Sequence, residues 1–360
     1  MKKIRIFCCI TLLSIALQAQ DIQFWHPVVT LTDSVACNAV ADQYTSPTCW
    51  TFGSNSLFES DLLKKYDLRV NLSEMFYARY AYIDKAARYL ATGGKTYFEG
   101  GGQFHDIIRV IKKYGMVPEL VYTGRPHNEK HHEHSLLDTA MQQLVKKLLR
   151  RGKTLLTVAD TRRMNDTLDK YLGKVPSVFM YNKKVYTPLS FAKDLLHFTN
   201  DYAEIVSFSD QPLYQKFMLK DKYNWANDSF MNVTLDDMKM IADTALANGW
   251  SLGWEGDVTE NSFNYYYGYA MADSLPTDLD TRRLANYKDE STVRDHMLHM
   301  VGDGYDSTHK RWYYMKNSWG KSNFMDGYMY MDENYFRYKT VILFVNKAAL
   351  PLKLREKVAF

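Results

Sequence analysis

The stretch DQYTSPTCWTF, residues 42–52, places a glutamine six residues before a cysteine at the start of a helix-like apolar run. A thiol that attacks a carbonyl carbon needs nearby hydrogen-bond donors for the oxyanion that forms. The Gln43 side chain can give one donor, and the Cys49 backbone N–H a second. The first turn of a helix also carries partial positive charge, which favours a thiolate. For an isolated cysteine a buried structural role is the simpler interpretation, so a nucleophile requires partners elsewhere in the chain.

Two candidate partners for the thiol lie near the C-terminus in the segment DHMLHMVG, residues 295–302. A histidine can pair with a thiolate and later protonate a leaving amine. His296 and His299 stand three positions apart on a strand-like run, so they face opposite sides of the sheet. The spacing alone leaves open which of them meets Cys49.

A group that can orient the histidine follows in the segment KNSWG, residues 316–320. The Asn317 side-chain oxygen can accept a hydrogen bond from an imidazole N–H and so fix the tautomer of the ring. Trp319 can shield that bond from water, which strengthens it. Taken alone, NSWG is an ordinary turn, and its significance comes from the cysteine and histidine that precede it.

The three blocks, in this order, resemble the signature blocks of papain-like cysteine peptidases. Further segments resemble the bleomycin hydrolase or aminopeptidase C branch of that family, and the resemblance covers roughly residues 42–351. These segments are GGQF at 101–104, KYGMVP at 113–118, VTLDDM at 233–238 and GWEGDV at 253–258.

The resemblance implies a role for each residue of the three blocks. Gln43 becomes the oxyanion-hole donor, Cys49 the nucleophile, His296 the general base and acid, and Asn317 the group that orients the histidine. His299 then falls on a packing position. The implied reaction is hydrolysis of a peptide bond through a thioester.

The resemblance also implies where a peptide binds. Gly101 and Gly102 are expected to offer backbone with which a substrate strand pairs, since glycine admits a close approach. Trp319 is expected to contact substrate as well. A flexible loop is the alternative interpretation of the glycine run.

We expect an α+β protein with the two-lobed papain-like fold, in which a cleft separates a helical N-terminal lobe from a strand-rich, barrel-like C-terminal lobe. Helical spacing dominates after Cys49, and short runs rich in aromatic and β-branched residues dominate after Trp250. The expected divisions are a signal peptide at 1–19, an N-terminal segment at 20–48, the helical lobe at 49–230 and the strand-rich lobe at 231–360.

The chain departs from the family pattern at three places. Pro47 stands where the family usually has glycine and restricts the turn before the nucleophile. Asp295 can raise the pKa of the neighbouring histidine or point to solvent. The residues after the terminal strand, 353–360, show little of the C-terminal arm that restricts the branch to aminopeptidase action. Aminopeptidase and endopeptidase action, and assembly into a homo-oligomer, are therefore left open.

The first residues have the pattern of a secretory signal. Lys2, Lys3 and Arg5 precede the apolar run 6–17, which is too short to span a bilayer. Cleavage after Ala19 predicts a secreted or periplasmic protein, and an uncleaved membrane anchor is the alternative. No later run has the length of a membrane span. The chain has a net charge of +4, and removing the leader leaves +1, which gives no argument for nucleic-acid binding.

The remaining cysteines and histidines offer weaker signals. Cys37 could form a disulfide with Cys49, which would abolish the nucleophile, and we favour a free Cys49. Neither cysteine has the spacing of a metal site, and no metal or cofactor is expected. A histidine-rich segment is interpreted as a solvated loop, with zinc or copper binding as the alternative. Its histidines are His127, His131, His132 and His134.

The predicted function is that of an exported cysteine peptidase, aminopeptidase-like, whose partners are peptide substrates. A catalytically inactive binding protein of the same fold is one alternative. A cysteine–histidine acyl transferase that uses the same thioester is the other.

Overall fold

The computed structural model describes residues 25–126, 129–195 and 201–358. The predicted signal peptide lies outside these residues. The helices are α1 (Cys49–Tyr66), α2 (Glu74–Ala91), α3 (Phe104–Tyr114), α4 (Ser135–Arg150), α5 (Val158–Leu172), α6 (Pro188–Leu195), α7 (Leu235–Ala247), α8 (Leu279–Lys288), α9 (Glu333–Lys339), α10 (Leu352–Lys357) and the 3-10 turn η2 (Lys347–Ala349).

The strands follow mainly in the second half of the chain. They are β1 (Val29–Ser34), β2 (Phe179–Tyr181), β3 (Lys184–Tyr186), β4 (Tyr202–Val206), β5 (Lys216–Met218), β6 (Ser229–Asn232), β7 (Leu252–Gly256), β8 (Phe263–Asn264), β9 (Tyr269–Ala270), β10 (His296–Asp306), β11 (Arg311–Lys316), β12 (Tyr328–Asp332) and β13 (Thr340–Asn346). Together with the helices they confirm the α+β class.

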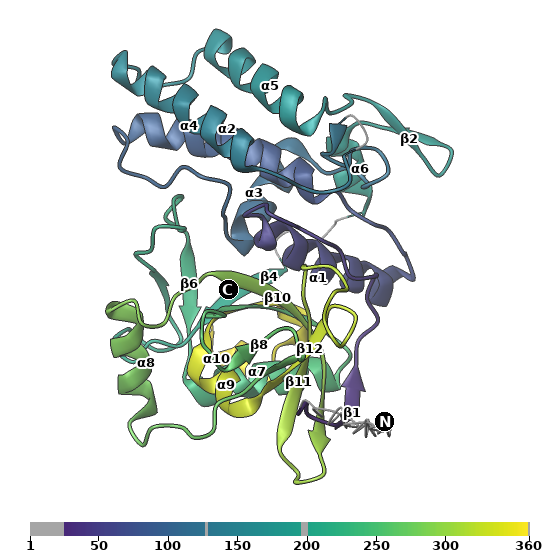
Figure 1. Ribbon diagram of the computed structural model, residues 1–360, viewed down its shortest axis with the longest axis vertical. Coiled ribbons are helices and arrows are strands. Elements are labelled where there is room, and N and C mark those ends of the chain that lie inside the picture. Colours follow the sequence, from purple (N-terminus) through teal and green to yellow (C-terminus); the bar gives the residue numbers. More distant parts are fainter. Residues whose placement is uncertain (1–24, 127–128, 196–200, 359–360) are drawn as a thin grey trace, which may run out of the picture.

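Two lobes are visible, with α1 between them. Figure 1 shows α2, α4 and α5 gathered at one end of the molecule and the large sheet at the other. The helix α1 is central because almost all of its residues from Trp50 to Leu62 are buried. A helix that is buried all round must pack against both neighbours, which here are the other helices and the sheet.

The large sheet has the strand order β5-β6-β4-β13-β7-β10-β11-β12-β9-β8, and β1 pairs with β10 from outside this path. Within the described residues the order does not return to its first strand, so the lobe expected to be barrel-like is an open sheet. Its two outermost strands, β5 and β8, are only three and two residues long. Strands this short offer few backbone groups with which the edges could pair.

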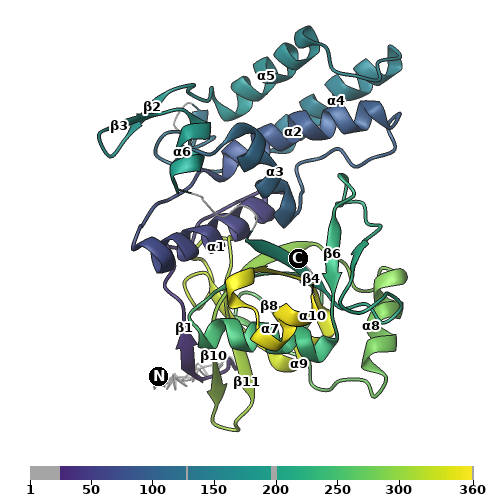
Figure 2. The same ribbon diagram turned by 180° about the vertical axis from the view of Figure 1, so that it is seen from behind.

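A separate hydrophobic core covers each face of the sheet. Alternate side chains of β13 divide between them: Ile342 and Phe344 join the helices of the first lobe, whereas Leu343 and Val345 face α7, α9 and α10. Figure 2 shows these three helices together against the sheet. A strand that is buried on both faces has an almost continuous run of apolar residues in its sequence, and β13 has such a run.

Strands from both sides of residue 230 share the large sheet. The strands β4, β5 and β6 belong to the large sheet, although most of their residues precede the expected boundary at 230. β1, from the segment 20–48, also joins it by pairing with β10. Short polar-flanked strands such as β5 and β6 give a weak sequence signal and are fixed by their neighbours instead. In the part of the chain that the structure describes, no helix combines the length and apolar character that crossing a membrane requires.

Replacing Phe344 by alanine tests the core between the lobes. Its ring stacks on Phe104 with centroids 4.9 Å apart and contacts Phe58 and Tyr202. We expect Phe344→Ala to lower the free energy of unfolding by about 3–5 kcal/mol, since it leaves a cavity. The matched substitution at the exposed Phe324 should change it by less than about 0.5 kcal/mol. Urea denaturation measures both, and equal effects would contradict the packing described.

Candidate active site

Cys49 is the first residue of α1 and remains partly exposed. The N-cap residue, Thr48, makes no side-chain capping hydrogen bond, and the first turn contains no acidic residue. The positive end of the helix dipole is therefore not offset by a local carboxylate. Both described cysteines are free, and the Cys37 sulfur lies 3.5 Å from the Tyr328 hydroxyl. The alternative of a Cys37–Cys49 disulfide is not what the structure contains.

The packing of α1 on β10 brings Cys49 to the start of that strand. A Cβ added at Gly53 would lie 3.5 Å from the Met297 Cβ, which is van der Waals contact and shows that helix and strand lie close together. The Met297 backbone is close enough to the Cys49 sulfur to lower the pKa of the thiol. The thiol is thereby placed beside the residue that follows His296.

His296 is held in one orientation by two side chains from the turn after β11. Its Nε2 lies 2.7 Å from the Asn317 Oδ1, which also accepts the Ser318 backbone N–H at 2.7 Å. Because this oxygen can only accept, the imidazole carries its proton on Nε2 and leaves Nδ1 as the basic nitrogen. The Trp319 ring stacks on the imidazole with centroids 4.4 Å apart. The structure thus brings the Asn317 and Trp319 side chains together with His296.

Gln43 is locked against the same turn. Its backbone N–H donates to the Ser318 carbonyl at 2.8 Å, and its side-chain oxygen accepts from the Ser318 hydroxyl at 2.6 Å. The amide nitrogen donates to the Ser46 carbonyl at 2.9 Å and has a second hydrogen to give. Sequence reasoning missed Ser318, although its place between Asn317 and Trp319 was the available signal.

Burial favours the neutral forms of the Cys49 thiol and the His296 imidazole. Burial raises the pKa of the Cys49 thiol; the Met297 backbone lowers it, and Glu255 and Asp295 raise it, so that it reaches about 12. Burial also lowers the pKa of His296 to about 4, against the opposing effect of Asn317. A thiolate or an imidazolium is therefore costly here unless the opposite charge lies beside it. Within the described chain, no direct hydrogen bond joins the two side chains.

Asp295 does not act on His296 as one interpretation of the sequence had it. Its Oδ1 accepts the Val258 backbone N–H at 3.0 Å. Burial raises the pKa of this carboxyl to about 6, and the Val258 hydrogen bond opposes that change. The other departure, Pro47, packs against the glycine run, where a Cβ added at Gly100 would lie 2.6 Å from its ring.

His299 lies behind the site. Its Nδ1 is 2.7 Å from the Ser56 hydroxyl, which also accepts from the Lys316 ammonium at 2.7 Å. Burial and the Lys316 charge lower the pKa of His299 well below its usual range. A cavity of about 20 Å³ beside it, also lined by Glu59 and Glu74, has room for about one water molecule.

The glycine run is a packed loop, not a flexible one. The Trp50 indole N–H donates to the Gly100 carbonyl at 3.0 Å, and Lys85 bonds the Gly101 carbonyl. A Cβ added at Gly102 would lie 2.7 Å from the Trp50 ring. The protein's own side chains therefore already require glycine at this position. The predicted pairing with a substrate strand stays a prediction.

The histidine-rich segment is not simply a solvated loop. His131 stacks on Tyr44 with centroids 4.4 Å apart, while His132 and His134 are buried. Burial lowers the pKa of these two imidazoles to about 3 and about 4. Among the described residues no group of three ligating side chains could hold a metal ion. His127 lies outside the described residues.

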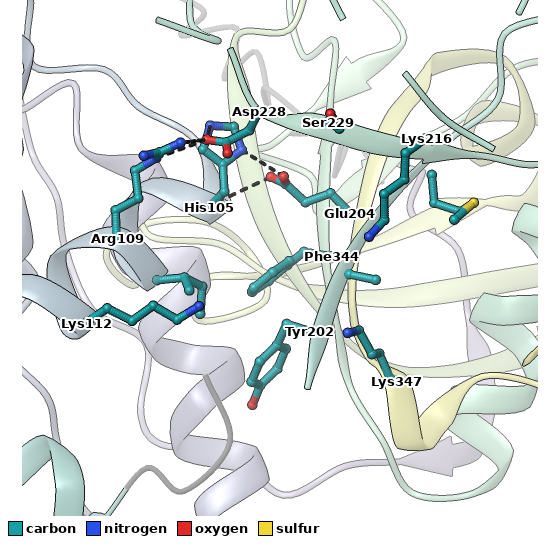
Figure 3. A pocket seen from close by; sticks show the side chains of 13 residues that line it. His105, Arg109, Lys112, Tyr202, Glu204, Lys216, Asp228, Ser229, Phe344 and Lys347 are labelled. Carbon is teal, nitrogen blue, oxygen red and sulfur yellow. Dashed lines mark hydrogen bonds and ion pairs between the residues drawn. The ribbon is translucent and has the colours of Figure 1, made fainter. Parts of the chain in front are cut away.

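A charged cavity of about 580 Å³ lies where α3 meets β4 and β13. Figure 3 shows His105 on its wall between Glu204 and Asp228, with Arg109 bonded to the same aspartate. Burial alone would lower the pKa of His105, but the neighbouring carboxylates outweigh it and raise the pKa to about 9. The imidazole is therefore a cation at neutral pH.

The fold and the site together define a cysteine peptidase with a cysteine, a histidine and an asparagine in papain-like order. A family model described as the Peptidase C1-like family matches residues 13–359, and the chain belongs to that family. The predicted papain-like class is confirmed.

Curated relatives and a solved structure agree with this assignment. Mitochondrial cysteine proteinase 1 of Saccharomyces cerevisiae is 22% identical over 95% of this chain and 80% of its own length. Aminopeptidase C of Lactobacillus helveticus is 24% identical over 88% and 81%. The crystal structure of PepW from Lactobacillus rhamnosis HN001 superposes with a TM-score of 0.71 and 18% identity, covering 91% of this chain and 84% of that one.

The protonated state of His105 predicts a pH-dependent stability. The folded pKa of about 9 exceeds the usual 6.5, so the contribution is fully present below pH 6.5 and is lost as the pH rises through 9. We expect His105→Gln to lower the free energy of unfolding by about 1–3 kcal/mol near pH 6 and by less near pH 9.5. Urea denaturation at both pH values measures this. The exposed His309→Gln control should change it by less than about 0.5 kcal/mol at either. If the difference in free energy of unfolding between the wild type and His105→Gln grew with pH, the assignment of His105 as a cation would be contradicted.

Proposed function

We propose that the protein is an exported, aminopeptidase-like cysteine peptidase that hydrolyses peptide bonds through a thioester on Cys49. The observation that carries the proposal is the His296–Asn317 hydrogen bond of 2.7 Å under the Trp319 ring, at the strand end where the Cys49 thiol lies. The names of aminopeptidases among its relatives support the aminopeptidase part. Export rests on the N-terminal sequence pattern, and the expected location is the periplasm or the outside of the cell.

In the proposed reaction, His296 takes the thiol proton on Nδ1 as the Cys49 sulfur attacks the peptide carbonyl carbon. The carbonyl oxygen becomes an oxyanion, which the free hydrogen of the Gln43 amide and the Cys49 backbone N–H stabilise. The C–N bond then breaks, and His296 returns its proton to the leaving amine. A water molecule, deprotonated by His296, hydrolyses the thioester and releases the acid and the free thiol.

A thiol-directed peptidyl epoxide tests the nucleophile. We expect a single adduct on Cys49 by mass spectrometry and complete loss of peptidase activity in Cys49→Ala. The melting temperature of that variant should stay nearly unchanged, since removing a partly exposed thiol leaves little cavity. Cys37→Ala is the matched control and should keep both labelling and activity. A folded protein that is not labelled, or is labelled at Cys37, would overturn the proposal.

The two histidines can be told apart by matched substitutions. We expect His296→Gln to lower kcat/KM by about 10²–10⁴-fold, since general acid–base catalysis is lost. His299→Gln should keep kcat/KM within about threefold of wild type while lowering the free energy of unfolding by about 1 kcal/mol through the lost Ser56 hydrogen bond. Peptide turnover well below the melting temperature measures the first effect and urea denaturation the second. If His299→Gln lost kcat/KM and His296→Gln kept it, His299 and not His296 would be the general base.

A further inference from the structure

The charged cavity beside α3 receives lysine side chains from three separate elements. Lys112 comes from α3, Lys216 from the edge strand β5 and Lys347 from the turn η2. Figure 3 shows their ammonium groups pointing into the cavity from different walls. Among the described residues that form these walls, none belongs to the proposed peptidase reaction. The function of the active site therefore gives no reason for this convergence of positive charge.

Among the described residues, two carboxylates line the cavity, and both are already paired. Glu204 lies 2.7 Å from the Nδ1 of His105, whose imidazole is a cation at neutral pH. Asp228 accepts from the Arg109 Nε at 3.0 Å. Because these four groups offset one another, the three lysines remain as excess positive charge on the walls.

The three lysines are close enough to act on one another. Burial lowers the pKa of Lys347, and the charges of Lys216 and Lys112 lower it further. Asp201 opposes this change, but it also lies 3.8 Å from the Lys65 ammonium. Like charges that face one another repel, and an anion placed between them replaces that repulsion with attraction. The cavity is therefore suited to an anionic ligand.

The directions of the lysines favour one type of anion. An ammonium group is a compact point charge with three donor hydrogens, and lysine is a common phosphate ligand in proteins. The two oxygens of a carboxylate lie in one plane, whereas the oxygens of a phosphate group point to the corners of a tetrahedron. Donors that arrive from three walls therefore match a phosphate group better than a carboxylate.

The size and the remaining walls of the cavity favour a small molecule over a single ion. A volume of about 580 Å³ lies within the range of small-molecule sites. Apolar side chains line the cavity beside the lysines and can contact an organic part of a ligand. They are Ile108, Ala203, Met231 and Phe344.

The walls belong to both lobes. The helix α3 packs with the helical lobe, whereas β4, β5 and β6 are strands of the large sheet and η2 follows its strand β13. An anion between Lys112 on one side and Lys216 and Lys347 on the other would join the lobes. A ligand that binds only the folded chain also raises its stability.

We propose that the charged cavity binds a small soluble molecule with two or more negative charges on phosphate groups, held by Lys112, Lys216 and Lys347 between the lobes. The proposal goes beyond the peptidase function and does not depend on it. Binding is electrostatic and hydrogen-bonded and makes no covalent bond. It strengthens the contact between α3 and the edge of the sheet.

Inorganic pyrophosphate is the probe, and isothermal titration calorimetry of the purified protein measures its binding. We expect saturable binding of one pyrophosphate per chain and a melting temperature that rises with pyrophosphate concentration. Succinate at the same ionic strength is the matched dicarboxylate and should bind at least about tenfold more weakly. Equal affinity for succinate would overturn the assignment to phosphate.

Matched substitutions locate the site. Lys216→Gln and Lys112→Gln should each weaken pyrophosphate binding by at least about tenfold, since each removes a hydrogen bond between charged groups. Both side chains are exposed, so the melting temperature without pyrophosphate should stay near that of the wild type. Lys146→Gln removes the charge of an exposed lysine on α4 and should keep the wild-type affinity. Cys49→Ala should keep it too, which separates this proposal from the peptidase function.

Three results would overturn the site. The first is the absence of saturable pyrophosphate binding in the folded wild type. The second is wild-type affinity in both Lys216→Gln and Lys112→Gln. The third is an equal loss of affinity in Lys146→Gln, which would show only non-specific attraction to a basic surface.

Sedimentation with phosphatidylglycerol vesicles separates a soluble phosphate compound from a lipid headgroup. We expect the wild type and Lys216→Gln to sediment equally little with these vesicles. Sedimentation of the wild type that is lost in Lys216→Gln would assign the same phosphate chemistry to a lipid and overturn the soluble ligand.

Discussion

The packing of α1 against β10 is the contact on which the rest of the site depends. Cys49 and His296 come from opposite ends of the chain, and only this helix–strand contact makes them neighbours. At Gly53 a Cβ would just reach van der Waals contact with Met297, so the space between the two elements holds little more than a methyl group there. Ser56 and His299 repeat the contact one turn further along with a buried hydrogen bond. The relative position of the thiol and the imidazole thus depends on packing contacts further along the same helix and strand.

The same burial has opposite effects on two features of the site. Excluding water strengthens the hydrogen bond from His296 to Asn317 and the stacking of Trp319 upon it. It also penalises an isolated thiolate or imidazolium, as the changed pKa values of both groups show. The N-terminus of α1 favours the thiolate but does not outweigh its desolvation. The surroundings therefore favour the neutral forms of both the Cys49 thiol and the His296 imidazole.

Much of the fold and site could be predicted because three short blocks carry local chemistry. A cysteine at a helix start, a histidine opening a strand and an asparagine in a tight turn each follow from neighbouring residues. That β4, β5 and β6 join the large sheet did not follow from the sequence, because these strands are defined by pairing with distant strands rather than by their own pattern. The buried state of His132 and His134 was missed for a similar reason, since a polar loop sequence gives no sign of what covers it.

The sequence by itself determined the α+β class, the papain-like family and the identity of Gln43, Cys49, His296 and Asn317 as candidates, because order and spacing along the chain carry that information. Only the tertiary structure decided that Ser318 holds Gln43 in place and that burial opposes a thiolate at Cys49. These features depend on contacts between residues far apart in sequence and on exclusion of water, neither of which is encoded in any local pattern.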